Sequence, residues 1–369
     1  MNKEYEIPQL PLPFDLETKA IMKKLVSANR RLAELKGVAL TIPNETILIS
    51  TLTLQEARES SLVENIVTTQ DDLYSADAEL KSFTNASTKE VLNYRAAIQH
   101  GFELVRKKHI LTCNIIKEVQ QLLEHNRAGF RQIPGTTLKR SDGSVVYTPP
   151  QDGKDVAKMM GNLEEFINNN ELCDLDPLIK MAIVHHQFES IHPFYDGNGR
   201  TGRIINILML VNNELLDLPI LYLSRYITHN KAEYYRLIQA IRDTAPNNKK
   251  EWEEWILFML KGVEETAINT TELIKHISSL MNSFKMKLRP IFGKVYKHEL
   301  LNNLFNHPYT KIEYMQRDMM VSRQTASKYL DKIVELGLLE KTKVSKENYY
   351  INTALVNLFI NQGNITNTP

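Results

Sequence analysis

The sequence predicts a mainly α-helical protein, with a helical bundle that carries one small β-hairpin and a smaller C-terminal domain. Glycine and proline, which interrupt helices, occur only 14 times each in 369 residues. Leu, Glu, Lys, Ala and Gln are frequent, and these side chains lose little freedom in a helix. Apolar residues also recur at helical spacing through most of the first 284 residues. The length suits two or three domains.

Composition and charge are those of an ordinary soluble protein, with 43% apolar and 24% charged residues. A net charge of +1 excludes binding to nucleic acid or membranes through overall charge, although a local patch stays open. Two cysteines, Cys113 and Cys173, cannot form a disulfide framework, so we expect a reducing, cytoplasmic location. Residues 1–13 are polar, and no run approaches about 18 apolar residues. We therefore expect no signal peptide and no membrane helix.

The N-terminal region, residues 1–88, is predicted to contain two helices. The first spans 15–35, where apolar residues follow an acidic start. The second spans 53–66. Thr53 is its candidate N-cap, because a threonine hydroxyl can accept a hydrogen bond from the free backbone N–H groups of a first turn. Residues 71–82 are polar and predict a connector.

The central region, residues 89–284, is predicted to be helical apart from one hairpin. The pair Asp142-Gly143 lies between the short pieces 130–133 and 145–147, which is the pattern of two strands joined by a tight turn. The remaining apolar periodicity predicts helices at 89–102, 111–125, 155–168, 177–189, 200–212, 231–242 and 250–280.

The C-terminal region, residues 285–369, has the element order of a winged helix-turn-helix. We expect helices at 296–305, 309–319 and 322–336, followed by short strands at 338–341 and 349–351. Residues 285–349 carry a net charge of +6, and Arg323, Gln324 and Lys328 would face a groove. This domain is predicted to dock either to DNA or to another protein, and the sequence leaves both open.

The segment HPFYDGNGRTGR, residues 192–203, joins two apolar helices by a polar, glycine-rich loop. Pro193 should push His192 out of the preceding helix, and Phe194 should pin the loop to the core. Gly197 and Gly199 allow positive φ, so that successive backbone N–H groups can turn inward and form an anion-binding nest.

Two arginines complete this loop. Arg200 and Arg203 lie three residues apart, on one face of the first turn of the next helix. Two guanidinium groups beside an anion nest predict a polyphosphate site. Asp196, at the mouth of the loop, could hold a Mg²⁺ ion that bridges phosphate oxygens.

Every position of the pattern H-x-F-x-D-G-N-G-R-x-x-R is filled here, and the segment therefore resembles the signature of Fic-domain proteins. The resemblance implies a Fic-type helical bundle with a hairpin flap. It also implies transfer of AMP from ATP to a Tyr, Thr or Ser hydroxyl of target proteins and of the enzyme itself. His192 would be the general base, and Asp196 would bind Mg²⁺ or Mn²⁺. The implied nucleotide-binding residues of the motif are Gly197, Asn198, Gly199, Arg200, Thr201, Gly202 and Arg203.

The flanking segments extend the resemblance to roughly residues 90–280. The hairpin at 130–147 is similar to the flap with which the family clamps a target segment. Asn230 and Tyr234 fall in a run that is similar to the closing segment, which implies contact with the adenosine end of ATP. The residues implied in target clamping are Ile133, Pro134, Gly135 and Thr136.

The second helix contains Ser60, Glu64 and Asn65, which match the family's inhibitory motif, Ser/Thr-x-x-x-Glu-Gly/Asn. Ser60 and Glu64 are four residues apart and share one helix face. Spacing alone would predict an ordinary solvated carboxylate. The resemblance implies instead that Glu64 pairs with Arg203 and removes the cation that should hold the γ-phosphate.

Two alternatives to a simple AMP transferase stay open at this point. One is a bifunctional enzyme that also removes AMP from its target. The other is a DNA-binding regulator that senses nucleotide through the Fic fold. Fic proteins often pair, so the resemblance makes a homodimer plausible. The lack of a long apolar run predicts no membrane partner.

Overall fold

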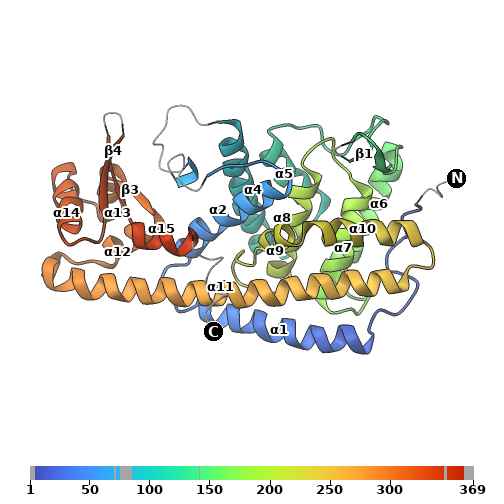
Figure 1. Cartoon of the computed structure of the whole chain (residues 1–369), viewed down its shortest axis with the longest axis horizontal. Helices are drawn as coiled ribbons and strands as arrows, with labels where there is room; N and C mark the ends of the chain where they lie inside the picture. The colour runs from blue at the N-terminus through green and yellow to red at the C-terminus, as the bar shows by residue number, and fades with distance from the viewer. Residues whose placement is uncertain (1–4, 70–71, 75–84, 141, 345–346, 361–369) are drawn as a thin grey trace. The chain divides into compact units, whose positions relative to one another are not determined.

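A computed structural model of the chain describes residues 5–69, 72–74, 85–140, 142–344 and 347–360 (Figure 1). The described elements are mainly helices, as predicted, with small antiparallel sheets. The predicted boundaries at 88/89 and 284/285 stay a prediction. The chain forms two compact units, the first from Met1–Glu34, Glu56–Ile66 and Asn93–Ala267, the second from Leu35–Gln55, Val67–Leu92 and Ile268–Pro369. Residues of both units occur in α1 (Lys19–Ala39), α2 (Glu45–Val63), α4 (Ala86–Lys108) and α11 (Lys249–Phe292).

The centre of the first unit is the helix pair α7 (Pro177–Ile191) and α8 (Asn198–Asn212), which pack against each other. Nearly every residue of both is buried, as expected for helices that are apolar all round. The helices α5 (Cys113–Glu124) and α6 (Gly153–Asn168) pack on α8 and α7, respectively. Side chains that precede α5, α6 and α7 accept N–H groups of the first turns and fix where these helices begin: Thr112, Asp152 and Asp176.

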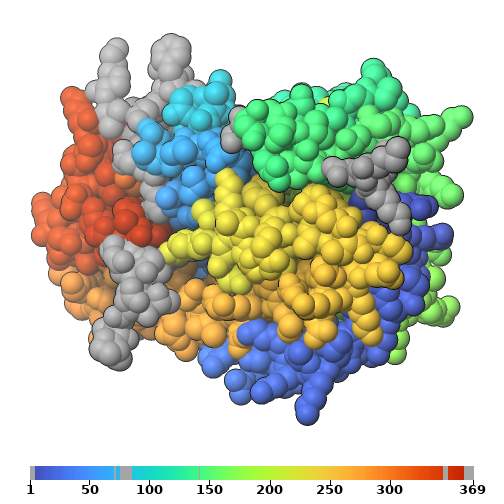
Figure 2. All heavy atoms as spheres, turned by 45° about the vertical axis from the view of Figure 1, so that its right-hand side comes forward, coloured from blue at the N-terminus to red at the C-terminus, as the bar shows by residue number. Residues whose placement is uncertain are grey.

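The predicted hairpin is present, although its first strand lies further along the chain than expected. β1 (Leu138–Lys139) pairs antiparallel with β2 (Val145–Tyr147). Residues 130–133 are not a strand, because the backbone N–H groups of Gln132 and Ile133 bond to a tyrosine side chain instead of a neighbouring strand. The hairpin region is exposed, as the green surface of Figure 2 shows, and the Ile133 side chain is 68% exposed.

The start of the second predicted helix was wrong. α2 begins at Glu45, so Thr53 lies inside it and donates its hydroxyl to the Ile49 carbonyl. Asn44 performs the capping role, since its Oδ1 accepts the N–H of Thr46 at 3.0 Å. Most of the connector predicted at 71–82 lies outside the described residues.

The C-terminal part follows the predicted order of helices and strands with two additions. The expected helix 309–319 was wrong for its first three residues, which form β3 (Tyr309–Lys311) and pair with β5 (Glu347–Ile351). The strand order is β3-β5-β4. A helix at the end, α15 (Thr353–Ile360), had not been predicted. The other elements here are η1 (Gly293–Val295), α12 (His298–Asn306), α13 (Ile312–Met319), α14 (Arg323–Glu335) and β4 (Glu340–Val344).

The predicted groove residues lie at the start of α14. Ser322 caps this helix, and Gln324 and Lys328 are exposed. Arg323 forms an ion pair with Glu313, so part of the local positive charge is already neutralised. Docking to DNA or to a protein stays a prediction for this domain. Among the described residues, no helix combines the length and apolar character needed to cross a membrane.

Candidate active site

His192 lies immediately after α7 and is held in a left-handed conformation, with φ 50° and ψ 59°. Its N–H still donates to the Phe188 carbonyl at 2.9 Å, and Pro193 then ends the helix. Burial lowers the pKa of the His192 imidazole to about 4, and Arg242 and Arg131 act in the same direction. The ring is therefore neutral at pH 7 and able to accept a proton.

The loop after His192 is fixed to the core, as predicted for Phe194. The Phe194 ring is fully buried and contacts Phe130 and Phe188, with ring centroids 5.3 and 6.3 Å away. The Asn198 amide bonds both backbone groups of Phe194: Oδ1 accepts its N–H and Nδ2 donates to its carbonyl, each at 2.8 Å. These contacts preorganise the loop before any ligand binds.

The two glycines of the loop serve different purposes. Gly197 has φ +76° and precedes α8, as predicted. Gly199 does not use the positive φ that glycine allows, because it lies in the first turn of α8. A Cβ at Gly199 would lie 2.4 Å from the Oε1 atom of Glu64. Glycine at this position therefore permits the close approach of a carboxylate.

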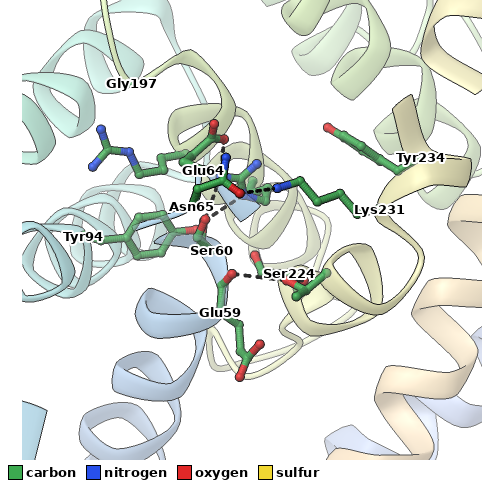
Figure 3. Close-up of polar contacts among 12 residues, drawn as sticks. Glu59, Ser60, Glu64, Asn65, Tyr94, Gly197, Ser224, Lys231 and Tyr234 are labelled. Carbon is green, nitrogen blue, oxygen red and sulfur yellow. Dashed lines mark hydrogen bonds and ion pairs between the residues drawn. The ribbon is translucent and has the colours of Figure 1, made fainter. Parts of the chain in front are cut away.

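Arg203 forms three hydrogen bonds with two residues at the end of α2, Ser60 and Glu64, both labelled in Figure 3. Its Nε donates to the Ser60 hydroxyl at 2.7 Å, and its Nη2 donates to the Ser60 carbonyl at 3.0 Å and to Glu64 Oε1 at 2.8 Å. The Arg203 side chain is 2% exposed and that of Glu64 is 35% exposed. Burial alone would raise the pKa of Glu64, but Arg203 and other nearby cations lower it, so the pair is ionised.

Further contacts fasten α2 in this position. The carboxyl of Glu56, fully buried two turns before Glu64, bonds the hydroxyls of Tyr94 and Ser224. Burial raises the pKa of Glu56 to about 8. Just after the C-terminal end of α2, Lys231 donates to the Asn65 side chain at 2.9 Å. Figure 3 shows these two residues joined by a dashed line. The inhibitory motif is thus attached to several elements of the first unit.

Arg200 has a carboxylate partner of its own, at the end of α5. Its Nη2 lies 2.8 Å from Glu124 Oε1, and the two side chains are 6% and 13% exposed. A Cβ at Gly197 would lie 2.3 Å from the same oxygen, so the carboxylate lies against the loop. One turn earlier on α5, Gln120 donates to the Asp196 carbonyl at 3.3 Å.

Family models match three parts of this chain. Residues 110–210 match the model described as Fic/DOC family, and residues 22–103 match Fic/DOC family N-terminal. Residues 280–355 match the model described as Protein adenylyltransferase SoFic-like, C-terminal domain. The first match contains the whole loop with His192, Arg200 and Arg203. This chain contains a Fic domain.

This chain shares part of its sequence with curated relatives. It is 28% identical to Protein adenylyltransferase Fic of Drosophila willistoni over 204 residues, which are 49% of this chain and 38% of the relative. It is 31% identical to Protein adenylyltransferase Fic of Drosophila grimshawi over 124 residues, or 33% of this chain and 25% of the relative. The chain thus spans well under half the length of these relatives.

Solved structures show the same fold. A Fic family protein from Desulfovibrio desulfuricans G20 superposes with a TM-score of 0.59 and 18% identity, over 92% of this chain and 98% of that one. Fic-1 from C. elegans superposes with a TM-score of 0.52 and 18% identity, over 69% and 73% of the two chains. At these identities the likeness concerns the fold alone.

The metal predicted at Asp196 fits the residues present. Asp196 is exposed at the mouth of the Fic loop, and one carboxylate oxygen accepts the Gly197 N–H at 2.7 Å. Mg²⁺ is commonly held by one or two carboxylates together with phosphate oxygens and water. No three His, Cys, Asp or Glu side chains gather as ligands in the part of the chain that the structure describes. An ion at Asp196 would therefore take most of its ligands from the substrate.

The residues predicted for the adenosine end lie at the junction of α9 (Leu223–His229) and α10 (Lys231–Thr244). The helix α9 had not been predicted. Asn230 donates its amide to the Tyr226 carbonyl at 2.9 Å. Tyr234 is 2% exposed and its hydroxyl lies 2.8 Å from His185 Nε2, whereas its neighbour Tyr235 is 46% exposed. Contact of Asn230 and Tyr234 with adenosine stays a prediction.

The flap is joined directly to the Fic loop. Arg131, at its start, donates from its backbone to the Pro193 carbonyl and from Nε to the His192 carbonyl, each at 2.8 Å. The Tyr195 hydroxyl accepts the N–H groups of Gln132 and Ile133 at 2.9 and 3.2 Å. Sequence analysis had assigned no role to Arg131 or Tyr195.

The predicted clamping residues follow these contacts as an exposed turn. Ile133, Pro134 and Gly135 are exposed, and Thr136 is half-buried. Gln151 holds this turn: its Oε1 accepts the Gly135 N–H at 2.7 Å and its Nε2 donates to the Thr136 carbonyl at 3.0 Å. Target clamping by these residues stays a prediction.

Thr201 and Gly202 are buried in α8 and lie in the core of the site rather than on its surface. A Cβ at Gly202 would lie 2.9 Å from Glu189 Oε1. Burial raises the pKa of this half-buried glutamate, three residues before His192, to about 7. The only signal for Glu189 in the sequence is a carboxylate within an apolar helix.

Proposed function

We propose that this protein transfers AMP from ATP to a Tyr, Thr or Ser hydroxyl of target proteins and of itself, and that Glu64 inhibits the transfer. The observation that carries the proposal is the complete loop: a half-buried, neutral His192 beside a preorganised anion-binding turn and two arginines. The names of the Drosophila relatives, Protein adenylyltransferase Fic, support the same reaction.

The step is an in-line displacement at the α-phosphorus. His192 accepts the proton of the incoming hydroxyl, whose oxygen forms the new bond to the α-phosphorus. The bond from that phosphorus to the bridging oxygen breaks, and pyrophosphate leaves. The backbone N–H groups after Gly197 and the positive end of α8 attract the phosphates, and Arg203 would hold the γ-phosphate. A Mg²⁺ ion held by Asp196 would supply neutralisation of phosphate charge.

Inhibition by Glu64 follows from the three hydrogen bonds that engage Arg203. A guanidinium already bonded to Ser60 and Glu64 has fewer donors for a phosphate. ATP would still bind through the loop, but with its phosphates displaced from the in-line geometry. A displacement of about 1 Å can reduce a rate by ~100-fold. Release of α2 would restore the geometry.

The transfer is tested with ATP labelled at the α-phosphate. We expect label on protein from the wild type and none from His192→Ala, while His192→Ala still binds ATP, because the loop and both arginines remain. A regulator that only senses nucleotide would bind ATP in both proteins and label nothing. Near wild-type labelling by His192→Ala would rule out His192 as the base.

The proposal also covers how the target protein binds and where in the cell the enzyme acts. The exposed flap turn at Ile133 would present backbone groups to an extended target segment. The two cysteines of the chain, Cys113 and Cys173, form no disulfide, which suits a cytoplasmic enzyme.

A further inference from the structure

The Fic loop is contacted by two carboxylates from two different helices. Glu64, after α2, pairs with Arg203 and lies against Gly199. Glu124, the last residue of α5, pairs with Arg200 and lies against Gly197. Both ion-pair distances are 2.8 Å. The two ion pairs thus share one distance, and they differ in the elements that support each carboxylate.

Glu124 is fixed by a helix that belongs to the core. α5 packs on α8 and α6, and its apolar face is fully buried. Gln120, one turn before Glu124, is bonded to the carbonyl of Asp196, and Lys117, one turn before that, lies 4.4 Å from the centre of the Phe130 ring. Moving Glu124 away from Arg200 would therefore disturb both the loop and the start of the flap.

The charge environment also favours a permanent pair. Glu124 lies at the N-terminal end of α8, where the helix dipole stabilises a negative charge. Its side chain is 13% exposed, against 35% for Glu64. Removing one partner of a buried ion pair is strongly destabilising, because it leaves an uncompensated charge in the core. A carboxylate so placed is unsuited to repeated release.

We propose that Glu124 is a positioning residue for AMP transfer, which holds the guanidinium of Arg200 in the orientation that meets the phosphates of ATP. This inference rests on the proposed function and deepens it. A guanidinium carries five donors in a rigid plane, so fixing one edge on Glu124 sets the direction of the others. Glu64 engages its arginine to inhibit, whereas Glu124 engages its arginine to orient.

The test measures label transfer and the KM for ATP in Glu124→Gln, both alone and combined with Glu64→Gly. We expect kcat/KM for ATP to fall at least about tenfold in both backgrounds, with a rise in KM. The KM is the decisive readout, because it does not depend on the fraction of folded enzyme. Glu118→Gln is the matched control, since Glu118 lies on the same helix, is 46% exposed and contacts His100 instead of the loop. It should leave both constants unchanged.

A second comparison separates positioning from folding. Arg200→Gln and the double variant Arg200→Gln/Glu124→Gln should have the same KM for ATP, because Glu124 acts only through Arg200. The double variant removes both charges and leaves no unpaired ion in the core. Its melting temperature reports any loss of fold.

Three results would overturn the positioning role. The first is faster transfer by Glu124→Gln than by the wild type, which would make Glu124 a second inhibitor. The second is an unchanged KM, and the third is an additional loss in the double variant. Absence of labelling by every protein, including wild type and Glu64→Gly, would instead overturn the proposed AMP transfer itself.

Discussion

The two arginine–glutamate pairs of the Fic loop differ in what holds the carboxylate, although their distances are the same. Glu124 belongs to α5, which packs on the core through a buried apolar face. Glu64 follows the last residue of α2, a helix that also buries apolar side chains such as Leu54 and Val63, but the Glu64 side chain itself is 35% exposed, against 13% for Glu124. The more exposed ion pair is screened by water and contributes less to stability, so we expect the carboxylate that lies outside its helix to be released more easily. The comparison teaches that one pair can open while the other stays closed.

The largest expected effect comes from opening the Glu64–Arg203 pair by substitution of Glu64. Glu64→Gly should raise label transfer by about 100-fold, because Arg203 becomes free to hold the γ-phosphate. Since α2 ends at Val63, this glycine replaces a residue outside the helix. We therefore expect little change in melting temperature. The measurement is label incorporation per minute by the two proteins at saturating ATP.

The double variant Glu64→Gly/His192→Ala is the control for this increase and should be inactive. Activity in the double variant would mean that the label comes from another site. Transfer by Glu64→Gly at the wild-type rate would contradict inhibition by Glu64. Glu64→Gln should release less, because its amide can still bond Arg203.

Substitution of the two glycines against which the carboxylates lie, Gly199 and Gly197, should change AMP transfer by smaller amounts. The two changes should have opposite signs. In Gly199→Ala, the new Cβ would lie 2.4 Å from the movable end of Glu64 and 3.2 Å from Arg203 Nη1. The closer contact should displace Glu64, so transfer should rise about tenfold. In Gly197→Ala, the new Cβ would meet the fixed Glu124 at 2.3 Å, at a residue with φ +76°. Transfer should then fall about tenfold. Labelling assays on both variants check the signs.

The same two alanines in the Glu64→Gly background sharpen the test. With Glu64 gone, Gly199→Ala should no longer increase transfer, whereas Gly197→Ala should still reduce it. If both alanines reduce transfer equally in the wild type, Gly199 serves the nucleotide rather than the approach of Glu64, and the contrast between the two pairs loses this support.

The Glu64–Arg203 pair was predicted from the sequence and the Glu124–Arg200 pair was missed, for a physical reason. Ser60 and Glu64 are four residues apart, so their common face is encoded locally, and the family motif named their partner. Glu124 and Arg200 are 76 positions apart in the sequence. A single glutamate at the end of an amphipathic helix looks like any solvated carboxylate. Only the packing of α5 on α8 brings it to the loop.

The fold shows the same division between local and distant information. The buried helices α7 and α8 were predicted because their apolar runs are continuous along the chain. The strand at Tyr309–Lys311 was missed, since three residues carry little periodicity and the partner strand begins 36 residues later. The separate purposes of Gly197 and Gly199 could not be predicted, because a glycine required for space is indistinguishable, in sequence, from one required for positive φ.

The smallest expected effect concerns the fastening of α2 and appears in the pH dependence of stability. Folding raises the pKa of Glu56 from its ordinary value near 4.5 to about 8, because the carboxyl is fully buried. Between these two values the folded protein keeps a proton that the unfolded chain releases. Stability must therefore fall as pH rises through this window and level off above it. Glu189, with its pKa raised to about 7, acts with the same sign.

Glu56→Gln keeps the hydrogen bonds to Tyr94 and Ser224 in an uncharged form and removes the titration. Between pH 5 and pH 9 its melting temperature should fall less than that of the wild type. The difference should be about 2–4 °C for each kcal/mol of stability that the proton on Glu56 contributes. Glu118→Gln, on the exposed face of α5, should follow the wild-type curve. Parallel curves for wild type and Glu56→Gln would mean that Glu56 is not held protonated.

In the active protein, a charged Glu56 loosens α2 but not α5, so the advantage of Glu64→Gly over wild type should shrink from pH 7 to pH 9. An advantage that stays constant across this range would show that Glu56 does not control the pair at Arg203.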